Sequence, residues 1–242
     1  MSLENFIPDI WSARLLANLH KAQVYTAPGV VNRDYEGEIR GAGDSVKINN
    51  IGAVTVGTYT KNTDISAAET LTDGQTILLI DQQKYFNFQI DDIDAAQQKP
   101  KVMDEAMREA GYALRNEADS YIAGLYSGVA AANLIGSTAA PKTDLGDAGA
   151  PYEYLVDLGI LLDEANIPSD GRFVVVPPWF HGLLLKDSRF VATGGTGAES
   201  TLANGMIGEA AGFTIRKSNN VPNTAGAKYR IIAGHPMAWS YA

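Results

Sequence analysis

The sequence predicts a mixed α+β fold, and three observations carry this prediction. Two strand-like stretches, at 44–51 and 76–92, enclose a long polar segment. An uninterrupted amphipathic pattern follows over 101–128 and predicts one helix of roughly seven turns. From residue 151 onward, helical and strand-like patterns alternate without a fixed-period repeat. This order is more typical of a body with a projecting arm than of an enzyme with an active site, so we expect a protein that assembles.

The N-terminal region predicts an amphipathic arm followed by a connector. We expect a helix to open at Asn5 or Pro8, since proline is favoured in the first turn. Its apolar residues fall mostly at helical spacing, with one tryptophan beside them: Ile10, Trp11, Leu15, Leu16 and Leu19. Residues 25–43 are rich in glycine and charged residues and have no sustained periodicity, which predicts an extended connector.

The two strand-like stretches predict a long β-hairpin. Their apolar residues alternate with polar ones, as in half-buried strands, at Val46, Ile48, Phe86, Phe88 and Ile90. The segment between them, 58–69, is too polar to build a core of its own. We therefore expect the loop from about Thr58 to Thr76 to become ordered only against a neighbouring molecule, while the strands stay folded near the long helix.

The long helix over 101–128 is predicted by apolar residues at three- and four-residue intervals: Met103, Met107, Ala110, Leu114, Tyr121 and Leu125. Two side-chain pairs, Glu105–Arg108 and Arg115–Asp119, are expected to support it. Proline precedes this stretch and glycine ends it, as expected at helix boundaries. The segment that follows, 130–150, is rich in small residues and predicts a junction between two lobes.

The second lobe predicts a helix, a turn, a strand and a second helix. The first helix is expected over 151–165, with an apolar stripe at Tyr154, Leu155, Leu158, Leu161 and Leu162. A turn at 166–171 ends it. Residues 172–177 predict a short buried strand, 178–185 a helix that begins after a proline, and 229–234 a further strand.

Composition and charge exclude several classes of function. The chain has 242 residues, 45% of them hydrophobic, and is long enough for one large domain or two lobes. Its net charge of −9 argues against a nucleic-acid-binding surface, because such affinity comes largely from Lys and Arg. The absence of cysteine excludes disulfides and thiolate chemistry and fits a reducing cytoplasm. No apolar run reaches the roughly 18 residues of a membrane span, so we expect no membrane partner.

Candidate catalytic residues are few, and ordinary explanations fit them. The three histidines, His20, His181 and His235, lack metal-ligand spacing, so we expect satisfied or exposed imidazoles. The sequence Gly43-Asp44-Ser45-Val46 is similar to the opening of a serine-hydrolase block. However, no strand precedes it and no Asp-x-x-His partner follows, so we interpret Ser45 as part of a strand entry.

Two loops and three tryptophans complete the candidates. The glycine-rich stretch 193–197 lacks the Gly-Lys-Ser or Gly-Lys-Thr of a phosphate loop, which favours a mobile loop. Asp91, Asp92 and Asp94 lack the glycine and the distant glutamate of a calcium loop, which favours a solvated turn. The tryptophans lie in separate segments and are expected in cores or subunit contacts: Trp11, Trp179 and Trp239. We therefore assign no catalytic, cofactor-binding or metal-binding residue, and we expect no cofactor and no enzymatic turnover.

The order of these elements, over nearly the whole chain, resembles that of the major capsid proteins of tailed bacteriophages, which have a Hong-Kong-97-type fold. The stretches that carry this resemblance are 10–16, 31–39 running into 43–48, and 204–222. The resemblance implies five parts: an N-terminal arm at 1–40, an extended loop with flanking strands at 41–98, a peripheral domain with the spine helix at 99–150, an apical domain at 151–222, and a return strand at 223–242.

Two details of the resemblance concern single segments. Similar chains usually continue past the strand at 229–234, so either a C-terminal segment is missing here or the subunit is short. Some relatives fuse neighbouring subunits through a lysine–asparagine isopeptide bond, for which Lys61 near the loop tip is a conceivable donor. No asparagine or carboxylate partner for Lys61 is assigned.

The resemblance implies a major capsid protein of a tailed phage or prophage that self-assembles, as pentamers and hexamers, into an icosahedral shell around the genome. Its further expected partners are scaffolding, portal and decoration proteins, and DNA enclosed without sequence-specific binding. The implied location is the virion capsid, after assembly in the bacterial host cytoplasm. Three alternatives stay open: a bacterial nanocompartment shell protein, a phage surface or receptor-binding module, and a serine hydrolase that uses Ser45 or the cluster Asp91–Asp94.

Overall fold

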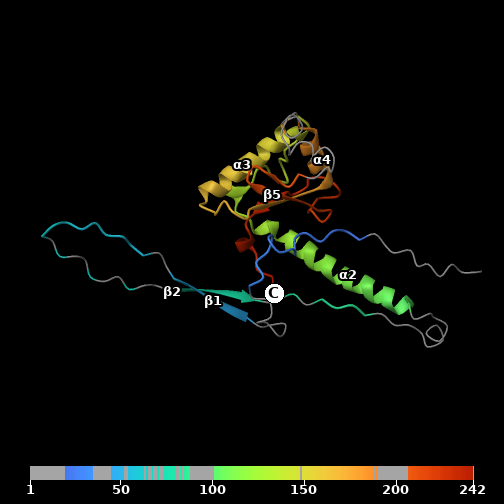
Figure 1. The fold of residues 1–242 in the computed structure, drawn as a ribbon, viewed down its shortest axis with the longest axis horizontal. Coiled ribbons are helices and arrows are strands. Elements are labelled where there is room, and N and C mark those ends of the chain that lie inside the picture. Colours follow the sequence, from blue (N-terminus) through green and yellow to red (C-terminus); the bar gives the residue numbers. More distant parts are fainter. Residues whose placement is uncertain are drawn as a thin grey trace, which may run out of the picture.

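The computed structural model describes residues 20–34, 45–51, 54–62, 73–79, 84–87, 101–147, 149–187 and 207–241, and the single residues 64, 67, 70, 82 and 189. Its helices are α2 (Lys101–Gly124), α3 (Ala150–Glu164) and α4 (Pro178–Lys186). Its strands are β1 (Ser45–Ile51), β2 (Asp73–Leu79), β3 (Phe173–Val176), β4 (Glu209–Ala210), β5 (Phe213–Lys217) and β6 (Ile232–Gly234). A mixed lobe with α3 and α4 stands beside the long helix α2, and the β1–β2 hairpin projects away from both (Figure 1). The predicted α+β class is confirmed.

The hairpin confirms the first predicted strand and corrects the second. β1 and β2 pair antiparallel, with Val46 opposite Leu78 and Ile48 opposite Thr76. β2 begins three residues earlier than expected and ends at Leu79, whereas the sequence pattern predicted a strand to residue 92. The described residues 84–87 are not in a strand. A strand needs a partner for its backbone N–H and C=O groups, and all seven residues of β1 are already paired with β2.

The long helix agrees with its prediction, except in its last turn and in one side-chain pair. α2 ends at Gly124, and a 3-10 turn over Leu125–Gly128 completes the predicted length. The pair Glu105–Arg108 forms at 3.1 Å. The predicted pair Arg115–Asp119 is wrong, because Asp119 bonds to other segments and the Arg115 Nε donates to the Gly111 carbonyl at 3.2 Å.

A four-stranded sheet in the order β4-β5-β3-β6 forms the centre of the mixed lobe. β3 runs parallel to β5 and antiparallel to β6. All four residues of β3 are buried, which explains its continuous apolar run. Their side chains alternate between two cores: Phe173 and Val175 pack with residues of α2, whereas Val174 and Val176 pack with residues of α3 and α4.

The predicted elements of this lobe are present within a residue or two of their expected bounds, from α3 through β3 to α4. The predicted strand at 229–234 is shortened to β6, which pairs with β3. Beyond β6, the chain returns to the N-terminal segment, where the Asn32 N–H donates to the Trp239 carbonyl at 2.8 Å. The domain boundaries proposed from the sequence stay predictions.

The segment predicted as an extended connector is in part a core element. Val24, Tyr25, Val30 and Val31 are each at most 8% exposed, and they pack against Ile122 of α2 and against β3. This segment also turns, with backbone hydrogen bonds from Ala27 to Val24 and from Val30 to Ala27. Over 25–34 the prediction failed because these contacts join residues far apart in the sequence, and no local periodicity records them. The rest of the predicted connector, 35–43, lies outside the described residues.

The predicted apolar stripe of α3 is correct at Leu155, Leu158 and Leu162, which pack into the core, and differs at Tyr154. The Tyr154 hydroxyl donates to Asp144, with the two carboxylate oxygens 2.6 and 2.7 Å away. This bond raises the pKa of Tyr154 from 10.0 to about 12 and lowers the pKa of Asp144. The bond therefore joins the residues before α3 to its first turns.

The Tyr154–Asp144 bond gives a pH-dependent prediction. Because folding raises the pKa of Tyr154, the stabilisation is fully present below pH 10 and is lost as the pH rises towards 12. In Asp144→Asn, we expect Tyr154 to ionise closer to its ordinary pKa. Ultraviolet difference titration of the phenol measures this shift, with Tyr154→Phe identifying its signal among the eleven tyrosines. An unchanged titration in Asp144→Asn would show that the carboxylate does not hold the phenol in solution.

Candidate assembly interface

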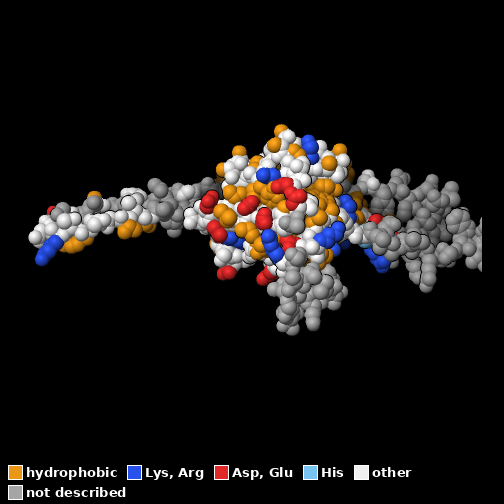
Figure 2. Space-filling view, turned by 90° about the horizontal axis from the view of Figure 1, so that it is seen from above, with side chains coloured by type: hydrophobic (Ala, Val, Ile, Leu, Met, Phe, Trp, Pro, Cys, Tyr) orange, Lys and Arg blue, Asp and Glu red, His pale blue; other side chains and the backbone are white. Residues whose placement is uncertain are grey.

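The β1–β2 hairpin presents the longest projecting surface of the described chain. Its described loop residues are exposed, and this includes apolar side chains: Val54 is 64% exposed, Val56 93% and Tyr59 70%. Lys61 lies in the turn at the tip, next to Asn62, whose φ of 68° is left-handed. The loop lies away from the body in both views (Figures 1 and 2). Exposed apolar side chains on such an arm are buried only if another molecule covers them.

The base of the arm is connected to α2 by one described ion pair. The Lys84 ammonium lies 3.0 Å from the Glu117 carboxylate of α2, and both side chains are about half exposed. Phe86, which the sequence pattern placed in a local hairpin core, is 43% exposed. Its expected companions Phe88 and Ile90 lie outside the described residues, so the predicted core stays a prediction.

A buried carboxylate joins the N-terminal segment to α2. Asp119 is fully buried, and its Oδ1 accepts hydrogen bonds from the backbone N–H groups of Val24, Tyr25 and Thr26 at 2.9, 2.7 and 3.1 Å. Its Oδ2 accepts from the Asn220 amide at 2.8 Å. These four donors replace the hydration that the carboxylate loses when it is buried. Asp119 therefore connects three segments: the N-terminal segment, α2 and the chain after β5.

The neighbours of Asp119 strengthen this connection. The side-chain amide of Asn220 also donates to the Asn116 Oδ1 of α2 at 3.0 Å, and its Oδ1 accepts from the Lys21 ammonium at 3.2 Å. Burial raises the pKa of the neighbouring Tyr25 phenol well above its usual value, and the charge of Asp119 adds to this effect. Tyr25 therefore stays neutral in the folded chain at any physiological pH.

A second connection joins the N-terminal segment to β5 at Pro28 and Gly29. The Arg216 guanidinium donates to the Pro28 carbonyl at 3.2 Å. Gly29 has a φ of 87°, and a Cβ at this position would lie 3.0 Å from the Arg216 Nη2. A side chain here would both strain the backbone and displace the arginine.

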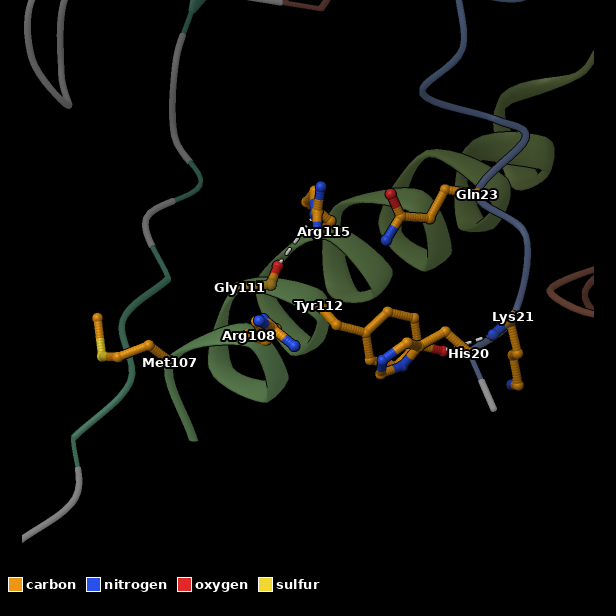
Figure 3. Close-up of a pocket in the computed structure, with 8 residues that line it drawn as sticks. All are labelled: His20, Lys21, Gln23, Met107, Arg108, Gly111, Tyr112 and Arg115. Atoms are coloured by element: carbon orange, nitrogen blue, oxygen red, sulfur yellow. Dashed lines mark hydrogen bonds between the residues drawn. The ribbon is translucent and has the colours of Figure 1, made fainter. Parts of the chain in front are cut away.

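A basic groove of about 570 Å³ lies along one face of α2 and is closed on one side by residues 20–23. Among the described residues, its lining consists of His20, Lys21, Gln23, Met107, Arg108, Gly111, Tyr112 and Arg115. Two carboxylates lie beside it: that of Glu105 is 3.1 Å from Arg108, and that of Glu109 is 3.6 Å from the His20 ring. The ring centroids of His20 and Tyr112 lie 4.0 Å apart, and Arg108 and Arg115 extend from the same helix about two turns apart (Figure 3). With these two carboxylates beside it, the groove's three cationic side chains still leave a small local excess of positive charge on a chain of net charge −9.

The three histidines lie on separate elements. The His20 ring lies against that of Tyr112 at a tilt of 39°, and its Nε2 lies 3.6 Å from the Glu109 carboxylate. His181 is buried in α4, and burial, followed by the charge of Lys217, lowers its pKa. The His235 Nδ1 accepts from the Met237 N–H at 3.3 Å. The described residues contain no cluster of three potential metal ligands, and the expectation of no bound metal stays a prediction.

The remaining sequence candidates are placed as follows. Ser45 begins β1, opposite Leu79, as the strand-entry interpretation predicted. Trp239 packs against the core near Phe173, whereas Trp179 of α4 is 39% exposed and contacts Tyr229 edge-on. Trp11, the stretch 193–197 and the cluster Asp91–Asp94 lie outside the described residues. None of the described helices is long and apolar enough to cross a membrane.

Sequence reasoning missed the role of Asp119, and it named Arg108 and Arg115 only as members of side-chain pairs along the helix. The signal for Asp119 was available: it lies three residues before the buried Ile122 and therefore shares its helix face. An acidic residue on a buried face needs hydrogen-bond donors from elsewhere. The groove had no such signal, because Lys21 and Arg108 are brought together only by tertiary packing.

Comparison with known proteins gives consistent results. The sequence profile described as phage capsid protein matches residues 75–241. A solved structure titled Mycobacterium phage Che8 is 30% identical, with a TM-score of 0.70, over 98% of this chain and 83% of that one. The capsid structure of the cyanophage P-SCSP1u is 18% identical, with a TM-score of 0.68, over 94% and 73%. The mature capsid of bacteriophage PhiM1 is 15% identical, with a TM-score of 0.62, over 95% and 77%. No curated protein sequence matches this chain.

Proposed function

The chain belongs to the phage capsid protein family and is a major capsid protein, and we propose that it forms a closed icosahedral shell of pentamers and hexamers around the phage genome. The observation that carries this proposal is the projecting hairpin, with apolar side chains exposed at Val54, Val56 and Tyr59. Repeated contacts between identical subunits would bury these side chains. The family membership favours a structural role without enzymatic turnover.

The charge of the chain supports enclosure of DNA without sequence-specific binding. With 28 acidic and 19 basic residues, the subunit repels a polyanion overall, so a shell would enclose the genome without binding it tightly. We further propose assembly in the bacterial host cytoplasm, with the virion capsid as the final location. Scaffolding, portal and decoration proteins are the proposed additional partners.

Expression of the full chain, alone and together with a scaffolding protein of the same phage, tests the shell. We expect capsomer rings or closed particles, because the exposed arm gains apolar burial only in an assembly. Analytical sedimentation measures the size distribution, and negative-stain microscopy shows closure. A protein that stays monomeric with the scaffold and at millimolar concentration would contradict the proposal.

A further inference from the structure

Helix α3 presents an outward face that carries acidic and apolar side chains together. Ile160 is 49% exposed and Val156 37%. Asp157 and Glu164 are exposed, and neither forms a salt bridge within the described part of the chain. Asp157, Ile160 and Glu164 follow at i, i+3 and i+7, so they form one stripe along the helix. Acidic and hydrophobic side chains lie next to one another on the face of the body that is seen from above (Figure 2).

The basic groove of α2 has the same spacing with the opposite charge. Arg108, Gly111 and Arg115 also follow at i, i+3 and i+7. In both helices the two charged residues are therefore separated by seven residues, or roughly 10 Å along the axis. Gly111 leaves a gap between the two arginines, since a Cβ built there would meet no atom within 4 Å. The exposed isoleucine of α3 thus has a matching space on α2.

We propose that the basic groove of α2 receives helix α3 of a second copy of this chain, with Arg108 and Arg115 facing Asp157 and Glu164, and Ile160 over Gly111. This inference rests on the proposed function, because it assigns one of the contacts between subunits. Copies with a net charge of −9 repel one another, so contact is least costly where a basic surface meets an acidic one. Because the α3 stripe includes apolar side chains, it suits contact with another protein surface better than contact with the phosphate backbone of a nucleic acid.

The groove is held in a fixed shape by its own contacts. The Lys21 N–H donates to the Tyr112 hydroxyl at 3.1 Å, which holds residues 20–23 against the helix. Arg115 is held over the groove by its bond to the Gly111 carbonyl (Figure 3). Arg108 pairs with Glu105 at 3.1 Å. A carboxylate of the second copy would therefore compete with Glu105 for Arg108, whereas Arg115 is already positioned by its backbone bond, which lowers the entropy cost of association at that end.

Charge reversal on each helix, alone and combined, tests the pairing. We expect Arg108→Glu with Arg115→Glu to slow assembly at least about tenfold, and Asp157→Lys with Glu164→Lys to do the same. The quadruple variant combines all four substitutions, so that the charges of the two helices are exchanged. Its assembly should return to within about threefold of the original rate. Light scattering at low salt measures the rate, and circular dichroism confirms that each variant is folded. The double variant Lys186→Glu with Lys217→Glu is the matched control for the arginine pair. It changes the net charge by the same amount, at exposed sites outside the groove.

The outcomes separate this inference from the shell itself. Rescue by the combined variant would support the α2–α3 contact. Slow assembly without rescue would show that another acidic partner, or a nucleic acid, occupies the groove, and would overturn the pairing. Normal assembly of both double variants would also overturn it while leaving the shell intact. Only an original chain that never assembles would contradict the proposed function.

Discussion

Replacement of Asp119 by alanine is expected to lower the free energy of unfolding by about 3–5 kcal/mol. The change removes the acceptor of three backbone N–H groups, from Val24, Tyr25 and Thr26, and of the Asn220 amide. These groups are buried or partly buried, so water does not fully replace the lost carboxylate. Each hydrogen bond to a charged group contributes about 1.5–3 kcal/mol to stability. The four hydrogen bonds together contribute less than four times this value, because they share one carboxylate.

Chemical denaturation followed by circular dichroism measures this change. Asp119→Asn keeps one acceptor oxygen for the backbone groups, so its free energy of unfolding should fall by about half as much as that of the alanine variant. Asp170→Ala is the matched control, because this exposed aspartate forms no ion pair with the described residues and should change stability by less than about 0.5 kcal/mol. A loss below about 1 kcal/mol in Asp119→Ala would contradict the role of this carboxylate as an anchor.

Deletion of Tyr59–Glu69 is expected to abolish closed shells and to leave a folded subunit. The described residues of this loop are exposed, so the subunit loses little buried area when they are removed. The loss concerns assembly, because among the described residues the arm projects far from the body (Figure 1). Sedimentation measures assembly, and the melting temperature should stay within about 2 °C of the intact chain. A truncated chain that still closes into shells would contradict the role of the arm.

Two milder experiments locate the effect within the arm. Val56→Ser and Tyr59→Ala remove exposed apolar side chains and should weaken assembly in proportion to the area that a neighbour covers. Hydrogen exchange should be fast over residues 54–62 in the free subunit and slow in the assembled shell. Equal and strong protection in both states would mean that the loop packs on its own subunit.

The local pattern of the sequence determined the elements that depend on local periodicity. The long helix, α3, α4 and the buried strand β3 were predicted within a few residues, because their apolar spacing repeats along one segment. The hairpin was predicted at β1 for the same reason. The second strand was extended too far, since alternation records which side chains can share a face and does not record whether a partner strand exists.

Tertiary structure decided the elements whose partners are distant. Asp119 lies about a hundred residues from Asn220 and from the segment Val24–Thr26, so its hydrogen bonds replaced the expected pair with Arg115. The connector became part of the core for the same reason, because Tyr25 and Val30 pack on Ile122 and on β3.

The sequence by itself therefore determined the α+β class, the long helix and the projecting polar arm, through spacing and composition. Only the tertiary structure decided where the N-terminal segment is anchored, and that Lys21, Arg108 and Arg115 line one groove opposite in charge to the outward face of α3. The physical reason is that periodicity is a property of one segment. Burial, hydrogen bonding and charge complementarity, in contrast, depend on which segments meet.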